Sequence, residues 1–290
     1  MVTAQAQQRG LAAMPMPHRR SADSRDRQGA AVLYDSHVHL DDPSWPVEQM
    51  LGELSNLTEL DGAMTAGYGP ERFAASRAIC AGDPRVVRSL GLHPWWLAGQ
   101  TPAQRDQGWQ ALLDELDDGP AVALGEIGLD KGLRARLSLE DQLHWMERGL
   151  LLARERELPV VLHIVGWYGR ALELLRRLGG PWPGVVHRWS GPVELVADFA
   201  ALGLHISLAL EPRSDLTKRA ALARAIPRER LLVESDWPFG ELTYPQAAVV
   251  TRKLAEQIAE WRNDHPEDLL KIVRQNGRSL YLGAQAGQRP

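Results

Sequence analysis

Short apolar runs alternate along the chain with longer segments in which apolar residues recur at every third or fourth position. Runs of the first kind predict buried strands, and segments of the second kind predict amphipathic helices. We find eight strand-like runs, at 31–40, 62–67, 86–92, 121–126, 159–163, 184–187, 203–210 and 231–236. Strands that alternate with helices are typical of a parallel sheet.

The clearest helix is predicted over residues 138–156. Ser138, followed by Asp141 three residues later, resembles a capping box at a helix start. The apolar residues that then share one helical face are Leu139, Leu143, Met146 and Leu150. This segment therefore has both a start signal and a face that can pack on a sheet.

Eight such units predict a single (β/α)₈ TIM barrel. The length of 290 residues fits one barrel of about 250 residues with a tail. A doubly wound sheet would require a Gly-rich phosphate loop after its first strand, and DSHVHL at 35–40 contains no glycine. We expect residues 31–290 to form the barrel domain. Residues 1–30 lack the apolar core of a signal peptide, and we expect them to form a disordered N-terminal tail.

Candidate metal ligands stand at the ends of five of the eight runs. They are His37, His39, Glu126, His163, His187 and Asp236. In a parallel barrel the carboxyl ends of all strands open onto one face, so these side chains are expected to converge there. Four imidazoles buried together would be costly without a cation to coordinate. The pattern predicts a dinuclear hydrolytic site in which a carboxylate bridges two ions, with zinc or manganese favoured by the imidazoles.

Six short motifs occur in an order that resembles the TatD-like metal-dependent nucleases. They are DSHVHL (35–40), GLHP (91–94), GEIGLD (125–130), LPVVLH (158–163), HRWSG (187–191) and ESDWP (234–238). The resemblance extends over almost everything from residue 31 to 283. It implies a barrel hydrolase that uses two divalent metal ions, for which zinc, manganese and magnesium are all allowed.

The resemblance also implies individual roles. His37, His39 and Asp236 would bind one ion, and His163 and His187 would bind the second, with Glu126 bridging the two. His93 would face the substrate. We expect Asp236, Glu126 and His93 to be catalytic, with Asp236 also able to accept a proton from the attacking water.

The chain departs from the family pattern at two positions where a phosphate contact is usual. Val165 stands two residues after His163, where the family usually has a basic residue, and PFGELTYPQ after Asp236 lacks the usual Arg-Asn motif. Basic residues in the expected loops that could replace these contacts are Lys131, Arg134, Arg188 and Arg213.

Ten tryptophans are many for this length, and six of them follow strand ends: Trp45, Trp95, Trp96, Trp167, Trp189 and Trp237. Together they predict an aromatic wall around the barrel mouth, of the kind that stacks bases of single-stranded nucleic acid. The substrate contacts that we expect are His93, Trp95, Arg188 and Trp189. The lone histidines His144, His205 and His265 are expected to be structural residues held by hydrogen bonds.

The charge balance limits the substrate. The first 30 residues carry five arginines and two aspartates, so the remaining chain has a formal charge of −7 against −4 for the whole. Non-specific binding to long duplexes needs a basic surface. Nucleic acid is therefore expected to bind locally, as a single-stranded end or a short oligonucleotide.

Several functions remain open on the sequence alone. The leading hypothesis is a phosphodiester hydrolase, a 3′–5′ exonuclease on single-stranded DNA or RNA. A metal-dependent amidohydrolase or esterase acting on a small amide, lactone or aminoacyl ester is the main alternative, and a non-catalytic subunit of a larger complex is another. The single cysteine, Cys80, and the lack of membrane-length apolar stretches favour a cytoplasmic protein with no membrane partner.

Overall fold

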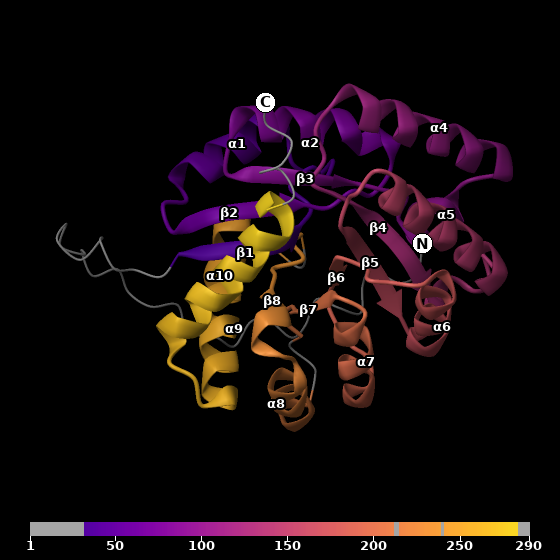
Figure 1. Ribbon diagram of the computed structural model, residues 1–290. Helices are drawn as coiled ribbons and strands as arrows, with labels where there is room; N and C mark the ends of the chain where they lie inside the picture. Colours follow the sequence, from indigo (N-terminus) through magenta and orange to yellow (C-terminus); the bar gives the residue numbers. More distant parts are fainter. Residues whose placement is uncertain (1–31, 212–214, 239–240, 284–290) are drawn as a thin grey trace.

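The computed structural model describes residues 32–211, 215–238 and 241–283 (Figure 1). Eight strands lie in one sheet in sequence order, and each of the seven successive pairs is parallel. The strands are β1 (Leu33–Val38), β2 (Leu60–Thr65), β3 (Val86–Leu90), β4 (Ala123–Asp130), β5 (Val160–Val165), β6 (Gly184–Val186), β7 (Leu204–Leu208) and β8 (Leu231–Val233). The predicted (β/α)₈ barrel is confirmed, although the second strand begins and ends two residues earlier than expected.

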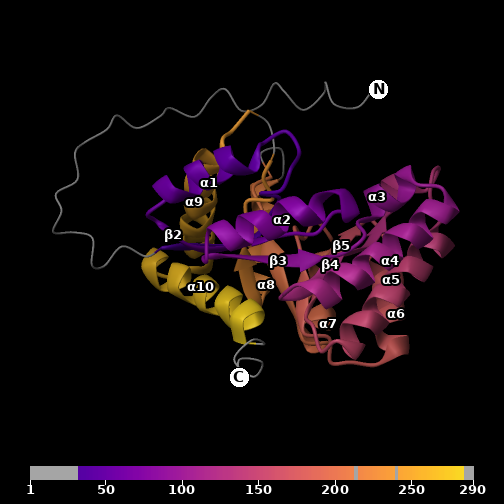
Figure 2. The same cartoon turned by 90° about the horizontal axis from the view of Figure 1, so that it is seen from above.

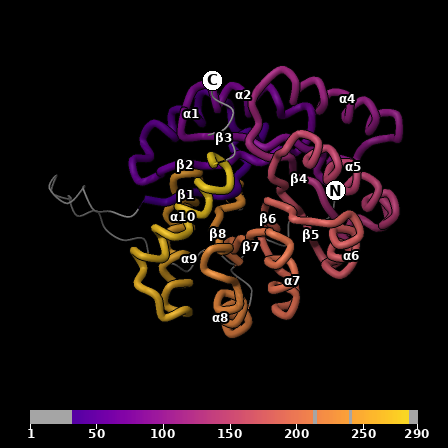
Figure 3. Tube along the Cα trace, viewed as in Figure 1, coloured from indigo at the N-terminus to yellow at the C-terminus, as the bar shows by residue number. Residues whose placement is uncertain are grey.

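Hydrogen bonds between the last strand and the first close the barrel. The Ser36 hydroxyl donates to the Val233 carbonyl at 3.0 Å, and the backbone N–H of Asp236 donates to the carbonyl of His37 at 3.0 Å. The buried carboxylate of Asp35 accepts from the backbone N–H of Ser235 at 2.9 Å. Figure 3 shows the consequence, with the yellow C-terminal helices beside the indigo first strand. This seam brings the histidine pair of β1 next to Asp236.

Helices surround the strands, as Figures 1 and 2 show. They are α1 (Val47–Asn56), α2 (Pro70–Gly82), α3 (Pro94–Gly99), α4 (Pro102–Asp118), α5 (Leu139–Glu155), α6 (Tyr168–Leu178), α7 (Val196–Ala201), α8 (Leu216–Ala225), α9 (Tyr244–Arg262) and α10 (Pro266–Leu282). The predicted helix over 138–156 is α5, and the Ser138 hydroxyl accepts from the backbone N–H of Asp141 at 3.0 Å. No helix among the described residues is long and apolar enough to cross a membrane.

A buried apolar cluster that includes two tyrosines packs between the strands and α10. Tyr281 of α10 is fully buried, stacks on Tyr34 with ring centroids 6.4 Å apart, and donates its hydroxyl to the Ser36 carbonyl at 3.2 Å. This packing ties α10 to the first strand. The predicted tail, residues 1–30, lies outside the described residues.

Candidate metal centre

The six candidate ligands come together at the carboxyl end of the barrel. His37 belongs to β1 and His39 follows it, Glu126 belongs to β4, and His163 belongs to β5. His187 and Asp236 follow the short strands β6 and β8 directly or within three residues. In each case the strand fixes the backbone and its end delivers the side chain, which is the arrangement expected of a parallel barrel.

Glu126 stands at the centre of this group because the neighbouring backbone comes unusually close. Its N–H donates to the carbonyl of Gly67 at 2.9 Å. A Cβ at Gly91 would overlap the backbone of Gly125 and Glu126, and Gly125 itself has a φ of +149°, which side-chain-bearing residues rarely adopt. Glycine at position 91 lets the segment after β3 approach β4, and glycine at position 125 lets β4 approach Val161 of β5, so the backbone on both sides of Glu126 is closely packed.

The two oxygens of Glu126 face different histidines. Oε2 lies 3.3 Å from Nε2 of His37 and 3.3 Å from Nε2 of His39. Oε1 lies 2.9 Å from Nε2 of His187 and 3.5 Å from Nδ1 of His163. One carboxylate thus separates two pairs of imidazoles, with one oxygen directed at each pair.

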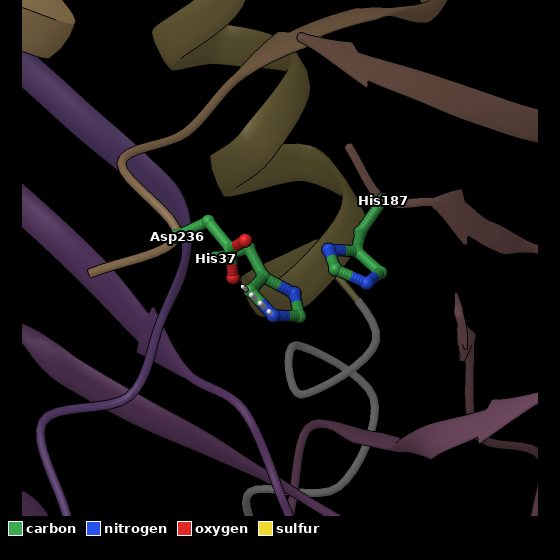
Figure 4. A group of neighbouring side chains, drawn as sticks. All are labelled: His37, His187 and Asp236. Carbon is green, nitrogen blue, oxygen red and sulfur yellow. Dashed lines mark ion pairs between the residues drawn. The ribbon is translucent and has the colours of Figure 1, made fainter. Parts of the chain in front are cut away.

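Asp236 completes the first group. Its Oδ1 lies 3.7 Å from Nε2 of both His37 and His39. Figure 4 shows Asp236, His37 and His187 gathered at this point, and the rings of His37 and His187 stack with centroids 4.0 Å apart. Three sets of potential ligand atoms are close enough to hold a cation: His37, His187 and Asp236; His37, His39 and Glu126; and His93, Glu126 and His163.

Several of these buried atoms have no hydrogen-bond partner of acceptable geometry. Both ring nitrogens of His37, both oxygens of Glu126 and Nδ1 of His187 are in this state. Burial alone would raise the pKa of Glu126, but the surrounding His187, His37 and His93 hold it well below its usual range. An ionised carboxylate among unpartnered imidazole nitrogens fits divalent cations, which would satisfy both oxygens of Glu126 and the Nε2 of His37 together.

Two carboxylates that sequence reasoning missed orient the histidines from outside. Oε1 of the fully buried Glu234 lies 3.3 Å from Nδ1 of His187, and Oδ2 of Asp130 lies 3.4 Å from Nε2 of His163. Nδ1 of His39 lies 3.3 Å from the carbonyl oxygen of Ala66. Such contacts fix the tautomer of a metal-binding histidine and the direction of its free nitrogen. The only signal in the sequence was the position of both carboxylates inside quoted motifs, GEIGLD and ESDWP.

His93 is placed to donate a hydrogen bond rather than to bind a metal. Its Nδ1 accepts from the backbone N–H of Trp95 at 2.9 Å, so the proton of the neutral ring lies on Nε2. Burial keeps the pKa of His93 well below its usual value, which leaves the ring neutral. Nε2 lies 3.5 Å from Oε1 of Glu126, at the inner edge of the mouth.

Arg188 reaches the same centre from the loop after β6. Its Nη1 lies 2.6 Å from Oδ2 of Asp236, and its Nε lies 2.7 Å from Oε1 of Glu211. About two fifths of its side chain remains exposed, at 42%. Lys131 and Arg134 are solvent-exposed, and Arg213 lies outside the described residues.

The prediction of a continuous aromatic wall is wrong. Trp189 is only 4% exposed because it packs between Tyr168 and Phe199, and Trp237 is fully buried. Trp189 therefore has no free face for a base, although its sequence position is close to the site. Trp95 alone of the tryptophans is largely exposed among the described residues, at 53%. The rim aromatics mostly serve to pack loops onto the barrel.

Three histidines and the cysteine lie away from the centre. His205 is buried with Nδ1 3.1 Å from the carbonyl of Gly184, as expected of a structural histidine. His144 and His265 are exposed, so neither is a core histidine, and neither belongs to a candidate ligand set among the described residues. Cys80 is free, and burial raises the pKa of its thiol to about 12.

Comparison with known proteins decides the family. The family model described as TatD related DNase matches residues 34–282, which is most of the chain. The protein belongs to the TatD family. It is therefore a metal-dependent hydrolase, and the family resemblance drawn from the motifs is confirmed.

Individual relatives support this placement. An uncharacterized metal-dependent hydrolase of Escherichia coli, YjjV, is 29% identical over 85% of this chain and 96% of its own length. The 3′-5′ ssDNA/RNA exonuclease TatD of Dickeya dadantii is 29% identical over 78% of this chain and 89% of its own length. The crystal structure of the E. coli TatD homolog YjjV superposes with a TM-score of 0.71 at 25% identity, covering 86% of this chain and 98% of that one.

Proposed function

We propose that this TatD-family enzyme hydrolyses phosphodiester bonds at the ends of single-stranded DNA or RNA, in the 3′ to 5′ direction. The observation that carries the proposal is the position of Glu126, with one oxygen toward each of two histidine pairs. A carboxylate so placed suits two ions that share it. Relatives named as 3′-5′ ssDNA/RNA exonucleases, including that of Dickeya dadantii, support the choice of substrate.

We assign His37, His39 and Asp236 to one divalent ion, His163 and His187 to the second, and Glu126 to both. Bound zinc, manganese or magnesium would supply Lewis acidity, both to acidify a water molecule and to neutralise the phosphate oxygens. In the hydrolysis, water oxygen bonds to phosphorus, the bond to the leaving oxygen breaks, and that oxygen gains a proton. The chain's own residues position these groups.

Asp236 is the proposed proton acceptor. Its Oδ1 faces His37 and His39, while its Oδ2 is held by the Arg188 guanidinium at 2.6 Å. This contact fixes the carboxylate in one orientation and keeps it ionised, as a general base requires. His93, with its proton on Nε2, is the proposed donor to a phosphate oxygen, since it lies beside Glu126 without being needed as a ligand.

The substrate is proposed to bind by one end. The body of the chain is acidic, so a long nucleic acid would be repelled outside the metal centre. Arg188 is the proposed phosphate contact at the mouth, because part of its guanidinium remains exposed beside Asp236.

A second candidate is hydrolysis of a small ester or amide by the same centre. It is favoured by Val165, an apolar side chain 40% exposed where the family usually has a basic residue. An uncharged substrate would not need a cation at that position.

The deciding experiment offers metal-loaded protein a panel of single strands labelled at the 3′ or 5′ end beside ester, lactone and amide substrates. We expect loss of nucleotides from the 3′ end, abolished by a chelator and restored by manganese, magnesium or zinc. Turnover of the small substrates with no release of nucleotides would favour the second candidate. Undiminished turnover after verified removal of all metal would refute both.

A further inference from the structure

Trp95 is exposed although its neighbour is not. Both Trp95 and Trp96 lie in α3, where consecutive side chains point in different directions. Trp96 is 8% exposed and fills space that the absence of side chains at Gly69 and Gly108 leaves open. Trp95 is 53% exposed and lies at the mouth of the metal centre. Packing therefore accounts for Trp96 but not for Trp95.

The exposed ring is nevertheless held in place. Its Nε1–H donates to Oδ2 of Asp130 at 2.6 Å, and its backbone N–H donates to Nδ1 of His93 at 2.9 Å. The ring also meets His93 edge-on, with centroids 6.3 Å apart and planes at 75°. The hydrogen bond fixes the indole ring of Trp95, so its apolar face has one orientation. A ligand that stacks on this face restricts the side chain little further, and the entropic cost of binding is therefore small.

Val165 extends this surface across the strand ends. It pairs in register with Asp130 on the neighbouring strand and follows His163 by two residues, so it shares the face of the sheet on which His163 lies. Its side chain is 40% exposed. Trp95 and Val165 thus flank the carboxylate that contacts His163 at 3.4 Å. We call these two side chains the apolar shelf.

We propose that the apolar shelf is the binding subsite for the nucleobase of the terminal nucleotide, with the base stacked on Trp95 and its edge against Val165. The proposal rests on the proposed function, since it assumes that the bond cleaved is a phosphodiester. Every base has an aromatic face, so the shelf accepts all four bases. At position 165 a basic residue would contact a phosphate, whereas Val165 contacts a base. The enzyme therefore holds the terminal nucleotide by its base.

Trp95 acts as a positioning residue as well. Because the same Oδ2 of Asp130 accepts from the Trp95 indole and faces His163, a base that presses on the ring also keeps Asp130 against the ligand. Stacking and ligand orientation can be separated by substitution. Trp95→Phe keeps an aromatic ring but removes the Nε1–H, whereas Trp95→Ala removes both.

The test measures kcat and KM of metal-loaded enzyme on two short oligonucleotides that differ only in the terminal nucleotide, which is normal in one and abasic in the other. Stacking of one base predicts that Trp95→Ala raises KM on the normal strand by about 5- to 150-fold. On the abasic strand the same variant should keep the parental KM, whereas its kcat should fall on both strands because the indole N–H that holds Asp130 is also lost. Trp95→Phe should keep KM close to the parent on both strands and lower kcat, because Asp130 loses its donor.

Val249→Ala is the matched control, since Val249 of α9 is an exposed apolar side chain, at 51%, that takes no part in the site. Equal rises in KM on both strands, or none on either, would overturn the shelf. If the parent cleaves neither oligonucleotide, the nuclease proposal has failed. The apolar shelf is then tested separately, by measuring the equilibrium binding of the labelled oligonucleotides. Equal affinity of parent and Trp95→Ala for the normal strand would overturn it; a loss confined to the normal strand would uphold it.

Discussion

Replacing Glu234 with Gln should weaken metal binding while leaving the fold intact. Oε1 of Glu234 lies 3.3 Å from Nδ1 of His187, and its other oxygen accepts from the Ser207 hydroxyl. The amide of Gln has the same shape, so its oxygen can keep the contact with His187 and its nitrogen the contact with Ser207. The substitution removes one buried negative charge next to Nδ1 of His187, a proposed metal ligand.

The expected size follows from that distance. Two full charges 3.3 Å apart interact by about 5 kcal/mol at an effective dielectric constant of about 20, which is an upper bound. A metal-bound imidazole carries no full charge, and the amide oxygen of Gln can keep the contact with Nδ1, so the substitution loses only a part of this value. Loss of such an outer partner typically lowers metal affinity by about 10- to 100-fold, or about 1.4–2.7 kcal/mol.

The assay is a titration with zinc or manganese in competition with a chelator of known affinity, together with kcat at saturating metal. We expect the weaker of the two binding steps to shift by about 10- to 100-fold and kcat at saturation to stay near the parental value. Glu115→Gln is the control, because Glu115 is also a buried carboxylate but pairs with Arg77 and Arg88 away from the site. An unchanged affinity in Glu234→Gln, or an equal shift in Glu115→Gln, would refute the role given to Glu234.

Four further predictions concern single residues. Asp236→Asn should lower kcat by at least about 100-fold with an unchanged unfolding midpoint, because the shape remains but the charged proton acceptor does not; a near-parental rate would reduce Asp236 to a structural residue. Arg188→Ala should reduce the salt dependence of oligonucleotide binding by about one unit of slope or less, as for one phosphate contact, and a larger change would mean that Arg188 organises other contacts. Cys80→Ser should leave turnover nearly unchanged, since the thiol has no partner near the centre; a clear loss of rate in folded protein would contradict this. Burial lowers the pKa of His205 to about 4 from 6.5. As the pH falls, the unfolded chain therefore binds the proton at a higher pH than the native chain, and stability is lost between these two values. His205→Gln should show a smaller fall in urea stability from pH 7 to pH 5, and an unchanged fall would exclude His205 as a cause.

The fold and the group of candidate ligands could be predicted because the signals are local. His37 and His39 share a strand face by their spacing alone, and each further candidate ends its own apolar run. Barrel topology then brings strand ends together whatever the loops do. The prediction needed only the order of the strands, which follows the sequence.

The side chains around that group could not be predicted, since their direction depends on neighbours distant in sequence. Trp95 and Trp189 each follow a strand end closely, yet Trp189 finds Tyr168 and Phe199 to pack against and becomes buried. Trp95 contacts the edge of His93 and the carboxylate of Asp130, and its ring stays largely exposed. In the sequence Glu234 belongs to an apolar strand-like run. Its contacts with Ser207 of β7 and with His187 become visible only in the folded chain.

The seam between the first and last strands has a consequence for how the enzyme is made. His37 leaves the ribosome first, and Asp236, with the backbone that closes the barrel onto it, is synthesised about 200 residues later. A nascent chain that stops short of Asp236 therefore lacks one member of the first proposed ligand group.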